Sequence, residues 1–182
     1  LSSEHDPRQR FWTVRTKHTI LATGAIERPI AFGNNDRPGV MSVSAARTYL
    51  NRFAVLSGKN IIVCTNNDSA YQTAIELCKS GAEVKLIDAR SEVKDSLSGM
   101  ALRNGLNLQM KAAPLNVNGS RSVRSLDIAV EINNKWQKGN TEFCDLVLVS
   151  GGWSPVIHLL SHRGIRPKWD DQNACFVPDK CR

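Results

Sequence analysis

The chain has 182 residues, of which 41% are hydrophobic and 23% charged, and its formal net charge is +7. This composition is ordinary for a globular protein. No stretch approaches the roughly eighteen consecutive apolar residues of a membrane-spanning helix, so we expect no role in a membrane. The basic residues are spread along the chain without interleaved aromatic residues, and we therefore expect no nucleic-acid partner.

The cysteines predict neither a zinc site nor a disulfide framework. They are five in number, and no two have the spacing of a CxxC motif (Cys64, Cys78, Cys144, Cys175 and Cys181). Free thiols suit a reducing compartment, so we expect a cytoplasmic protein. The sequence has no initiator methionine, and its last residues do not complete a helix or strand. We interpret it as a segment of a longer polypeptide.

Two strands, a long loop and a helix are predicted at the start of the chain. Phe11–Thr16 alternates between apolar and polar residues, and Thr19–Ala22 is a short apolar run, as is typical of strands. Residues 26–39 are rich in glycine, proline and asparagine and are expected to form a crossing loop. Ser42–Phe53 has helical spacing with a serine at its N-cap.

A strand–helix–strand unit follows. Asn60–Cys64 is an apolar run suited to a buried parallel strand, Ser69–Ser80 has an apolar helical face ending before Gly81, and Glu83–Ile87 is a second strand. The remaining predicted elements are a helix over Glu92–Asn104, strands over Leu106–Ala112, Ser125–Ile132 and Cys144–Val149, a hairpin or meander after Asn133-Asn134, and a short helix over Pro155–His162. The fold class is α/β, with a Rossmann-like three-layer βαβ domain and an antiparallel meander.

The turn between the first strand and helix of this unit stands where a dinucleotide-binding turn would. Aligned on G-x-G-x-x-G, it has Thr65, Asn67 and Ala70 in place of the glycines, and Asp68 adds a negative charge. Asp88 lies 23 positions after Thr65, which suits an acidic residue that binds a ribose hydroxyl. The turn is either a nucleotide site with unusual residues or a scaffold that has lost its ligand; we favour the scaffold.

Two further strand ends carry glycine, where ligands of open α/β sheets collect. One is Thr23-Gly24-Ala25, and the other is Gly151-Gly152. The order of a strand ending in Ala-Thr-Gly, a crossing loop, a degenerate βαβ unit and a second glycine-ended strand resembles the flavin-dependent pyridine-nucleotide oxidoreductases. In that family a second Rossmann-like domain interrupts an outer dinucleotide domain.

Several strings narrow the resemblance to the alpha subunits of heterotetrameric sarcosine oxidases. They are Ala22-Thr-Gly-Ala-Ile-Glu-Arg-Pro29, Asn35-Asp-Arg-Pro-Gly39, Ala45-Ala-Arg-Thr-Tyr-Leu-Asn51, Thr65-Asn-Asn-Asp-Ser-Ala-Tyr71, Asp88-Ala-Arg90, Gly151-Gly-Trp-Ser-Pro-Val-Ile-His-Leu159 and Ala174-Cys-Phe-Val-Pro178. The resemblance implies that residues 1–57 end the first dinucleotide domain, residues 58–150 form the degenerate second domain, and residues 151–182 return to the first. The Rossmann-like domain is then flanked by incomplete parts of an FAD/NAD-binding domain.

The resemblance also implies a reaction, cofactors and partners. These enzymes oxidise sarcosine to glycine with oxygen, giving hydrogen peroxide, and release the methyl carbon as formaldehyde or methylenetetrahydrofolate. FAD lies on the beta subunit, FMN between alpha and beta, and NAD in the first dinucleotide domain of alpha, while tetrahydrofolate is associated with its C-terminal part. The expected partners are the beta, gamma and delta subunits.

Since this chain lacks the first βαβ turn, we expect it to supply a secondary wall of the NAD site and to bind no cofactor by itself. The candidate cofactor-binding residues are Thr23, Gly24, Ala25, Gly151 and Gly152, with weaker candidates in Glu27, Arg28, Asn67 and Asp88. Glu27 and Arg28 alternatively pin the domain crossover. We assign no catalytic residue and no metal ligand, and His158 and His162 are interpreted as structural.

Two alternatives stay open. The chain could belong to a related opine oxidase, proline dehydrogenase or amine oxidase subunit, in which case the fold and cofactors are kept and the substrate differs. Alternatively, residues 58–150 form an inert module that orients neighbouring subunits.

Overall fold

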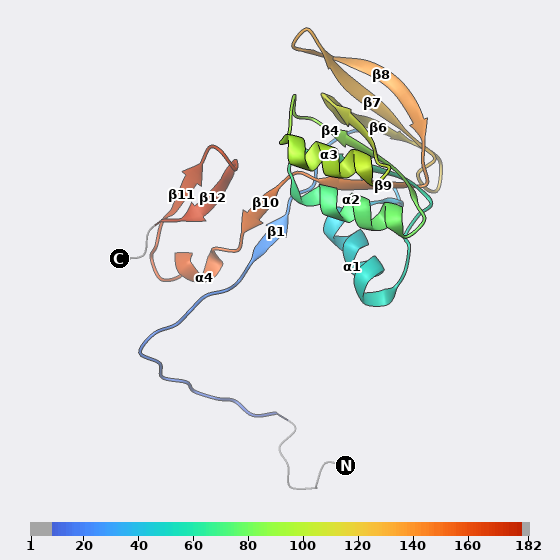
Figure 1. Cartoon of the computed structure of the whole chain (residues 1–182). Helices are drawn as coiled ribbons and strands as arrows, with labels where there is room; N and C mark the ends of the chain where they lie inside the picture. Colours follow the sequence, from blue (N-terminus) through green and yellow to red (C-terminus); the bar gives the residue numbers. More distant parts are fainter. Residues whose placement is uncertain (1–8, 180–182) are drawn as a thin grey trace, which may run out of the picture.

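A computed structural model describes residues 9–179 of the chain. Its centre is a five-stranded parallel sheet with the strand order β2-β9-β3-β4-β5 (Figure 1). The strands are β2 (Val40–Ser42), β3 (Asn60–Thr65), β4 (Glu83–Asp88), β5 (Asn107–Met110) and β9 (Leu146–Ser150). The last of these in the chain lies between the first two, so segments distant in sequence form the middle of the sheet.

Three helices cover one face of this sheet and an antiparallel sheet covers the other (Figure 1). The helices are α1 (Val43–Phe53), α2 (Ser69–Lys79) and α3 (Asp95–Arg103), and the antiparallel strands are β6 (Ala112–Asn118), β7 (Ser125–Ile132) and β8 (Lys135–Phe143). Alternate side chains of β3 serve the two cores: Ile61 and Val63 pack with the helices, and Ile62 and Cys64 pack with the antiparallel sheet. The predicted three-layer α/β fold is confirmed.

Local sequence signals explain where the helices begin and end. The Ser42 hydroxyl accepts a hydrogen bond from the Ala45 backbone N–H at 3.2 Å and caps α1, as predicted. Gly81, immediately beyond the C-cap of α2, has a φ of +95°, a conformation that other residues rarely adopt.

A smaller part of the structure lies beside the three layers (Figure 1). β1 (Ala25–Glu27) pairs antiparallel with β10 (Trp153–Pro155), and this two-stranded ribbon leads away from the parallel sheet. Beyond it lie a short helix, α4 (His158–Ser161), and a hairpin of β11 (Pro167–Asp170) and β12 (Cys175–Pro178). The domain boundaries proposed above stay predictions.

The strands predicted over Phe11–Thr16 and Thr19–Ala22 are wrong. Both segments lack regular structure, and Phe11 and Ile20 are 99% and 92% exposed. A strand needs a neighbour to satisfy its backbone hydrogen bonds, and among residues 9–179 no strand pairs with either segment.

The strand predicted over Leu106–Ala112 is divided in the structure. Lys111 has a φ of +53°, which breaks the extended backbone between β5 and β6. β5 therefore stays in the parallel sheet while β6 joins the antiparallel sheet. The short strands β10, β11 and β12 had no clear periodicity and were missed.

The described cysteines are all free, and Cys181 lies outside the described residues. Cys64 and Cys144 are buried as expected, whereas Cys78 is only partly buried and donates to the Asn104 carbonyl at 3.4 Å. Burial, reinforced by the Asp145 charge, raises the pKa of Cys144 to about 12. Burial also raises the pKa of Cys64, so both thiols are expected to stay protonated near neutral pH.

The core of the parallel sheet predicts the effect of truncating Leu148. This β9 side chain is 0% exposed and packs against the helix layer. We expect Leu148→Ala to lower the free energy of unfolding by about 3 kcal/mol through lost burial and the cavity left behind. Leu102→Ala on α3, where the side chain is 60% exposed, is the control and should cost less than about 1 kcal/mol. Urea unfolding followed by circular dichroism measures both, and equal losses would contradict the assigned core.

Candidate functional site

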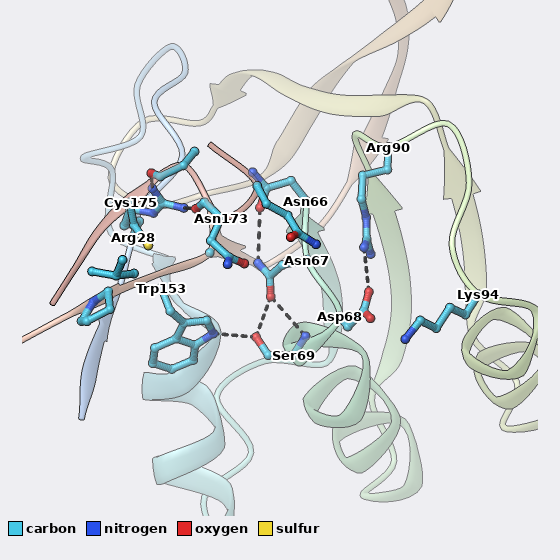
Figure 2. Close-up of a pocket in the computed structure, with 15 residues that line it drawn as sticks. Arg28, Asn66, Asn67, Asp68, Ser69, Arg90, Lys94, Trp153, Asn173 and Cys175 are labelled. Atoms are coloured by element: carbon cyan, nitrogen blue, oxygen red, sulfur yellow. Dashed lines mark hydrogen bonds and ion pairs between the residues drawn. The ribbon is translucent and has the colours of Figure 1, made fainter. Parts of the chain in front are cut away.

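A cavity of about 780 Å³ lies beyond the carboxyl ends of β3, β4 and β9, the edge where ligands of open α/β sheets bind (Figure 2). One wall is the turn Asn66–Ser69, which leads into α2. Arg90 and Lys94, which follow β4, form another. The ribbon and the β11–β12 hairpin close the remaining side, with Arg28, Gly152, Trp153, Pro155, Gln172, Asn173, Ala174, Cys175 and Val177.

A chain of side-chain hydrogen bonds covers the start of α2 (Figure 2). The Asn67 amide donates to the Ser150 carbonyl at 3.0 Å and contacts the Ser150 hydroxyl at 3.1 Å. Its Oδ1 accepts from the Ser69 N–H at 3.1 Å and from the Ser69 hydroxyl at 2.6 Å. The Trp153 indole N–H donates to the same hydroxyl at 2.8 Å. The turn is therefore bonded to the end of β9 and to β10 by its own side chains.

Asp88 is enclosed at the end of β4 and is 0% exposed. Its carboxylate accepts from the Tyr71 hydroxyl at 2.9 Å, the Arg90 backbone N–H at 3.0 Å, and Arg90 Nε and Nη2 at 3.1 and 2.8 Å. Burial, followed by the Asp88 charge, raises the pKa of Tyr71 well above its ordinary value, so the hydroxyl stays a donor. A buried carboxylate with these partners is not accessible to a ribose in the cavity.

Arg90 joins two carboxylates of different exposure. Nη2 lies 2.8 Å from Oδ2 of buried Asp88, and Nη1 lies 2.6 Å from Oδ1 of Asp68, whose side chain is 52% exposed. Partial burial disfavours the charged guanidinium, but the hydrogen bonds and charges of the two aspartates outweigh it and raise the pKa of Arg90. Arg90 is thus a permanent cation at the cavity edge.

Thr23, Gly24 and Ala25 lie on the ribbon and not on the cavity wall. The Thr23 hydroxyl donates to the Val156 carbonyl at 2.7 Å, and the Gly24 carbonyl accepts from the Val156 N–H at 2.9 Å. Ala25 is opposite Pro155. All three are exposed, and their contact with NAD stays a prediction.

Gly151 and Gly152 permit close approach of the two chain segments that form the ribbon. The Gly151 N–H donates to the Arg28 carbonyl at 2.7 Å, and a Cβ at Gly151 would lie 2.9 Å from the Pro29 carbonyl oxygen. Gly152 has a φ of +95°, and a Cβ there would lie 2.6 Å from Arg28 Nη2. Both positions require glycine for the ribbon itself, and of the two only Gly152 lines the cavity.

Glu27 and Arg28 bind on opposite sides of the ribbon. Glu27 Oε2 accepts from the Ser44 N–H at 2.8 Å, at the positive start of α1. The Arg28 guanidinium donates to the Ala174 carbonyl, and to the Asn173 carbonyl at 3.1 Å. One residue ties the ribbon to the helix layer and the next ties it to the hairpin, an arrangement that fits the pinning alternative.

The sequence-based candidates omitted most of the polar cavity wall. Ser69, Arg90, Lys94 and Trp153 were not chosen, because nothing in their spacing indicates that they meet. His158 and His162 are exposed and do not line the cavity. Within residues 9–179 no cluster of histidine, cysteine, aspartate or glutamate is arranged to hold a metal ion. No helix in the same range has the length and hydropathy to cross a bilayer.

The turn does not fit a diphosphate in the usual Rossmann position. That mode needs bare backbone N–H groups at the start of the helix. Here the first of them, Ser69 N–H, is bonded to Asn67, and the Trp153 indole lies against the Ser69 hydroxyl. Asp68 adds a carboxylate at the same place, and Asp88 has no free face for the ribose.

The family model described as pyridine nucleotide-disulphide oxidoreductase matches residues 8–179. The chain belongs to this family. Among solved structures of similar fold, Lactococcus lactis thioredoxin reductase superposes with a TM-score of 0.64 at 18% identity, over 86% of this chain and 50% of that one. Histamine dehydrogenase from Rhizobium sp. 4-9 gives 0.57 at 16% identity, over 79% and 24%. At these identities the likeness concerns the fold of the oxidoreductase family only.

Curated relatives in this oxidoreductase family include the alpha subunits of sarcosine oxidases. That of Corynebacterium sp. (strain U-96) is 38% identical over 94% of this chain and 18% of its own length. That of Rhizobium meliloti (strain 1021) is 34% identical over 96% and 17%. An opine oxidase subunit of Agrobacterium tumefaciens (strain Ach5) is 26% identical over 91% and 36%. The predicted resemblance to sarcosine oxidase alpha subunits is confirmed, and the chain spans less than a fifth of their length.

The enclosure of Asp88 predicts that the Tyr71 hydroxyl stabilises this member of the oxidoreductase family. Tyr71→Phe removes the hydrogen bond to the buried carboxylate, and we expect a loss of about 1–2 kcal/mol in the free energy of unfolding. Tyr49→Phe, at a side chain that is 46% exposed, is the matched control and should change stability by less than about 0.5 kcal/mol. Chemical denaturation measures both, and an unchanged Tyr71→Phe variant would contradict a structural role for Asp88.

Proposed function

We propose that the chain is part of the NAD-binding alpha subunit of a heterotetrameric, cytoplasmic sarcosine oxidase. In this reaction sarcosine, oxygen and water give glycine, formaldehyde and hydrogen peroxide, or methylenetetrahydrofolate replaces formaldehyde when tetrahydrofolate is present. The supporting observation for the substrate is that relatives named for sarcosine oxidation are 34–39% identical over nearly the whole chain, whereas the opine oxidase relative is 26% identical.

Within this subunit, we assign residues 58–150 a supporting rather than a diphosphate-binding role. The observation that carries this assignment is the hydrogen-bonded path from Ser150 through Asn67 and Ser69 to Trp153, which covers the start of α2. Polar groups already paired with one another gain little by exchanging partners with a ligand. NAD then belongs to the first dinucleotide domain, while FAD on beta and FMN between alpha and beta supply the redox chemistry.

Two other functions keep specific support. An opine or other secondary-amine oxidoreductase shares the fold and is favoured by the match to the opine oxidase of Agrobacterium tumefaciens. A module without any ligand, which only orients the beta, gamma and delta subunits, is favoured by the closed turn.

The substrate is tested in the full-length alpha polypeptide that contains this chain, assembled with its partner subunits. We expect sarcosine-dependent oxygen uptake, with a kcat/KM at least about tenfold above those for proline and for opines. The three amines are compared under identical conditions with an oxygen electrode, and peroxide formation is measured in parallel. No uptake with sarcosine, or a preference for an opine, would reject the substrate assignment.

The supporting role of the turn predicts that NAD binding survives its alteration. In the assembled enzyme, Asn67→Ala removes the bonds to Ser150 and Ser69, and Trp153→Phe removes only the indole donor. We expect both variants to retain the NAD content of the unaltered enzyme, measured after denaturation and chromatography. Loss of NAD from both variants, with flavin content and thermal stability unchanged, would place NAD at this turn and contradict the proposal.

A further inference from the structure

We propose that the Arg90–Lys94 end of the cavity binds a phosphomonoester, whose place next to Arg90 is taken by the Asp68 carboxylate in this structure. This inference rests on the proposed exclusion of a diphosphate from the turn. The two sites are distinct: the excluded position lies over the start of α2, and the phosphomonoester position lies between β4 and the start of α3 (Figure 2).

Asp68 marks the position of the anion. Its Oδ1 lies 2.6 Å from Arg90 Nη1, a distance typical of a strong charge-assisted hydrogen bond. The other carboxylate on Arg90, from Asp88, is 0% exposed and also holds Tyr71, so it is a fixed part of the core. Asp68 is 52% exposed, and exchange with a dissolved anion costs it little desolvation.

Lys94 supplies the second cation. It lines the same cavity at the N-cap of α3 and is exposed, and its ammonium group takes part in no hydrogen bond or ion pair within residues 9–179. Figure 2 shows this ammonium group directed toward Asp68 and the end of Arg90. An unpaired ammonium beside a half-neutralised guanidinium leaves an excess of positive charge at this end.

The charge and shape of this end favour a dianion with three terminal oxygens. A guanidinium offers parallel donors to two oxygens of a phosphate, and an ammonium offers a point charge to the third. Asp95, the next residue along, is exposed and is not part of the cavity wall. The Trp153 ring, 38% exposed, and the amide of Asn173 line the other end of the cavity, where the rest of a ligand of nucleotide size has room.

The experiment is calorimetric titration of the full chain at low ionic strength and about pH 8, where a phosphomonoester carries close to two charges. The probes are adenosine 5′-monophosphate, adenosine, inorganic phosphate and NAD, which has a diphosphate but no phosphomonoester. We expect saturable binding of the monophosphate, competition by inorganic phosphate, weakening by salt, and no binding of adenosine. Binding of NAD as tight as that of the monophosphate would count against the closed turn, and so against the proposed function, independently of this site.

Two variants test the residues. Lys94→Gln should weaken binding of the monophosphate about threefold to fivefold, and Lys79→Gln, at the exposed far end of α2, should leave it unchanged. Asp68→Asn keeps a good helix-capping residue and removes the competing charge, so it should strengthen binding by a similar factor. Arg90 is left intact because its loss would strand buried Asp88.

The inference is overturned if the monophosphate fails to bind both the unaltered chain and Asp68→Asn. It is also overturned if Lys94→Gln and Lys79→Gln weaken binding equally, since the effect would then reflect net charge alone. Weakened binding in Asp68→Asn would show that this carboxylate supports the ligand instead of standing in its place, and would likewise reject the proposal.

Discussion

The parallel pairing of β9 between β2 and β3 governs the arrangement of the cavity. Thr65, the last residue of β3, is in register with Ser150, the last residue of β9. Because parallel strands end at the same edge, the turn after β3 and the ribbon after β9 start side by side. The Asn67 amide reaches Ser150 for this reason, and the indole of Trp153 reaches Ser69.

The second constraint is the burial of a carboxylate at the end of β4. A buried charge is costly unless it is paired and hydrogen-bonded, and Asp88 satisfies that requirement with Tyr71 and Arg90. The acidic residue that would receive a ribose in a nucleotide-binding Rossmann domain is therefore part of the core. Its partner Arg90 still reaches the surface through Asp68, and this converts an acidic position into a basic cavity edge.

These two constraints separate support from binding within one cavity. The covered turn joins the Rossmann-like layers to the ribbon, and Glu27 and Arg28 tie the same ribbon to α1 and to the β11–β12 hairpin. The basic edge lies outside this set of contacts, so it is free to interact with an anion without loosening the connection. The positions of Gly151 and Gly152 belong to the connecting function, since a side chain at either would collide with residues that follow β1.

The sequence by itself determined the elements of the central unit, because their signals are local. Apolar runs over Asn60–Cys64 and Cys144–Val149, the helical face of Ser69–Ser80 and the stop at Gly81 act through near neighbours in the chain. Only the tertiary structure decided that Phe11–Ala22 has no strand partner among residues 9–179, and that Asp88 is enclosed while the Lys94 ammonium is unpaired. Strand pairing, burial and charge neutralisation depend on groups brought together from distant positions, and single-residue spacing carries no record of them.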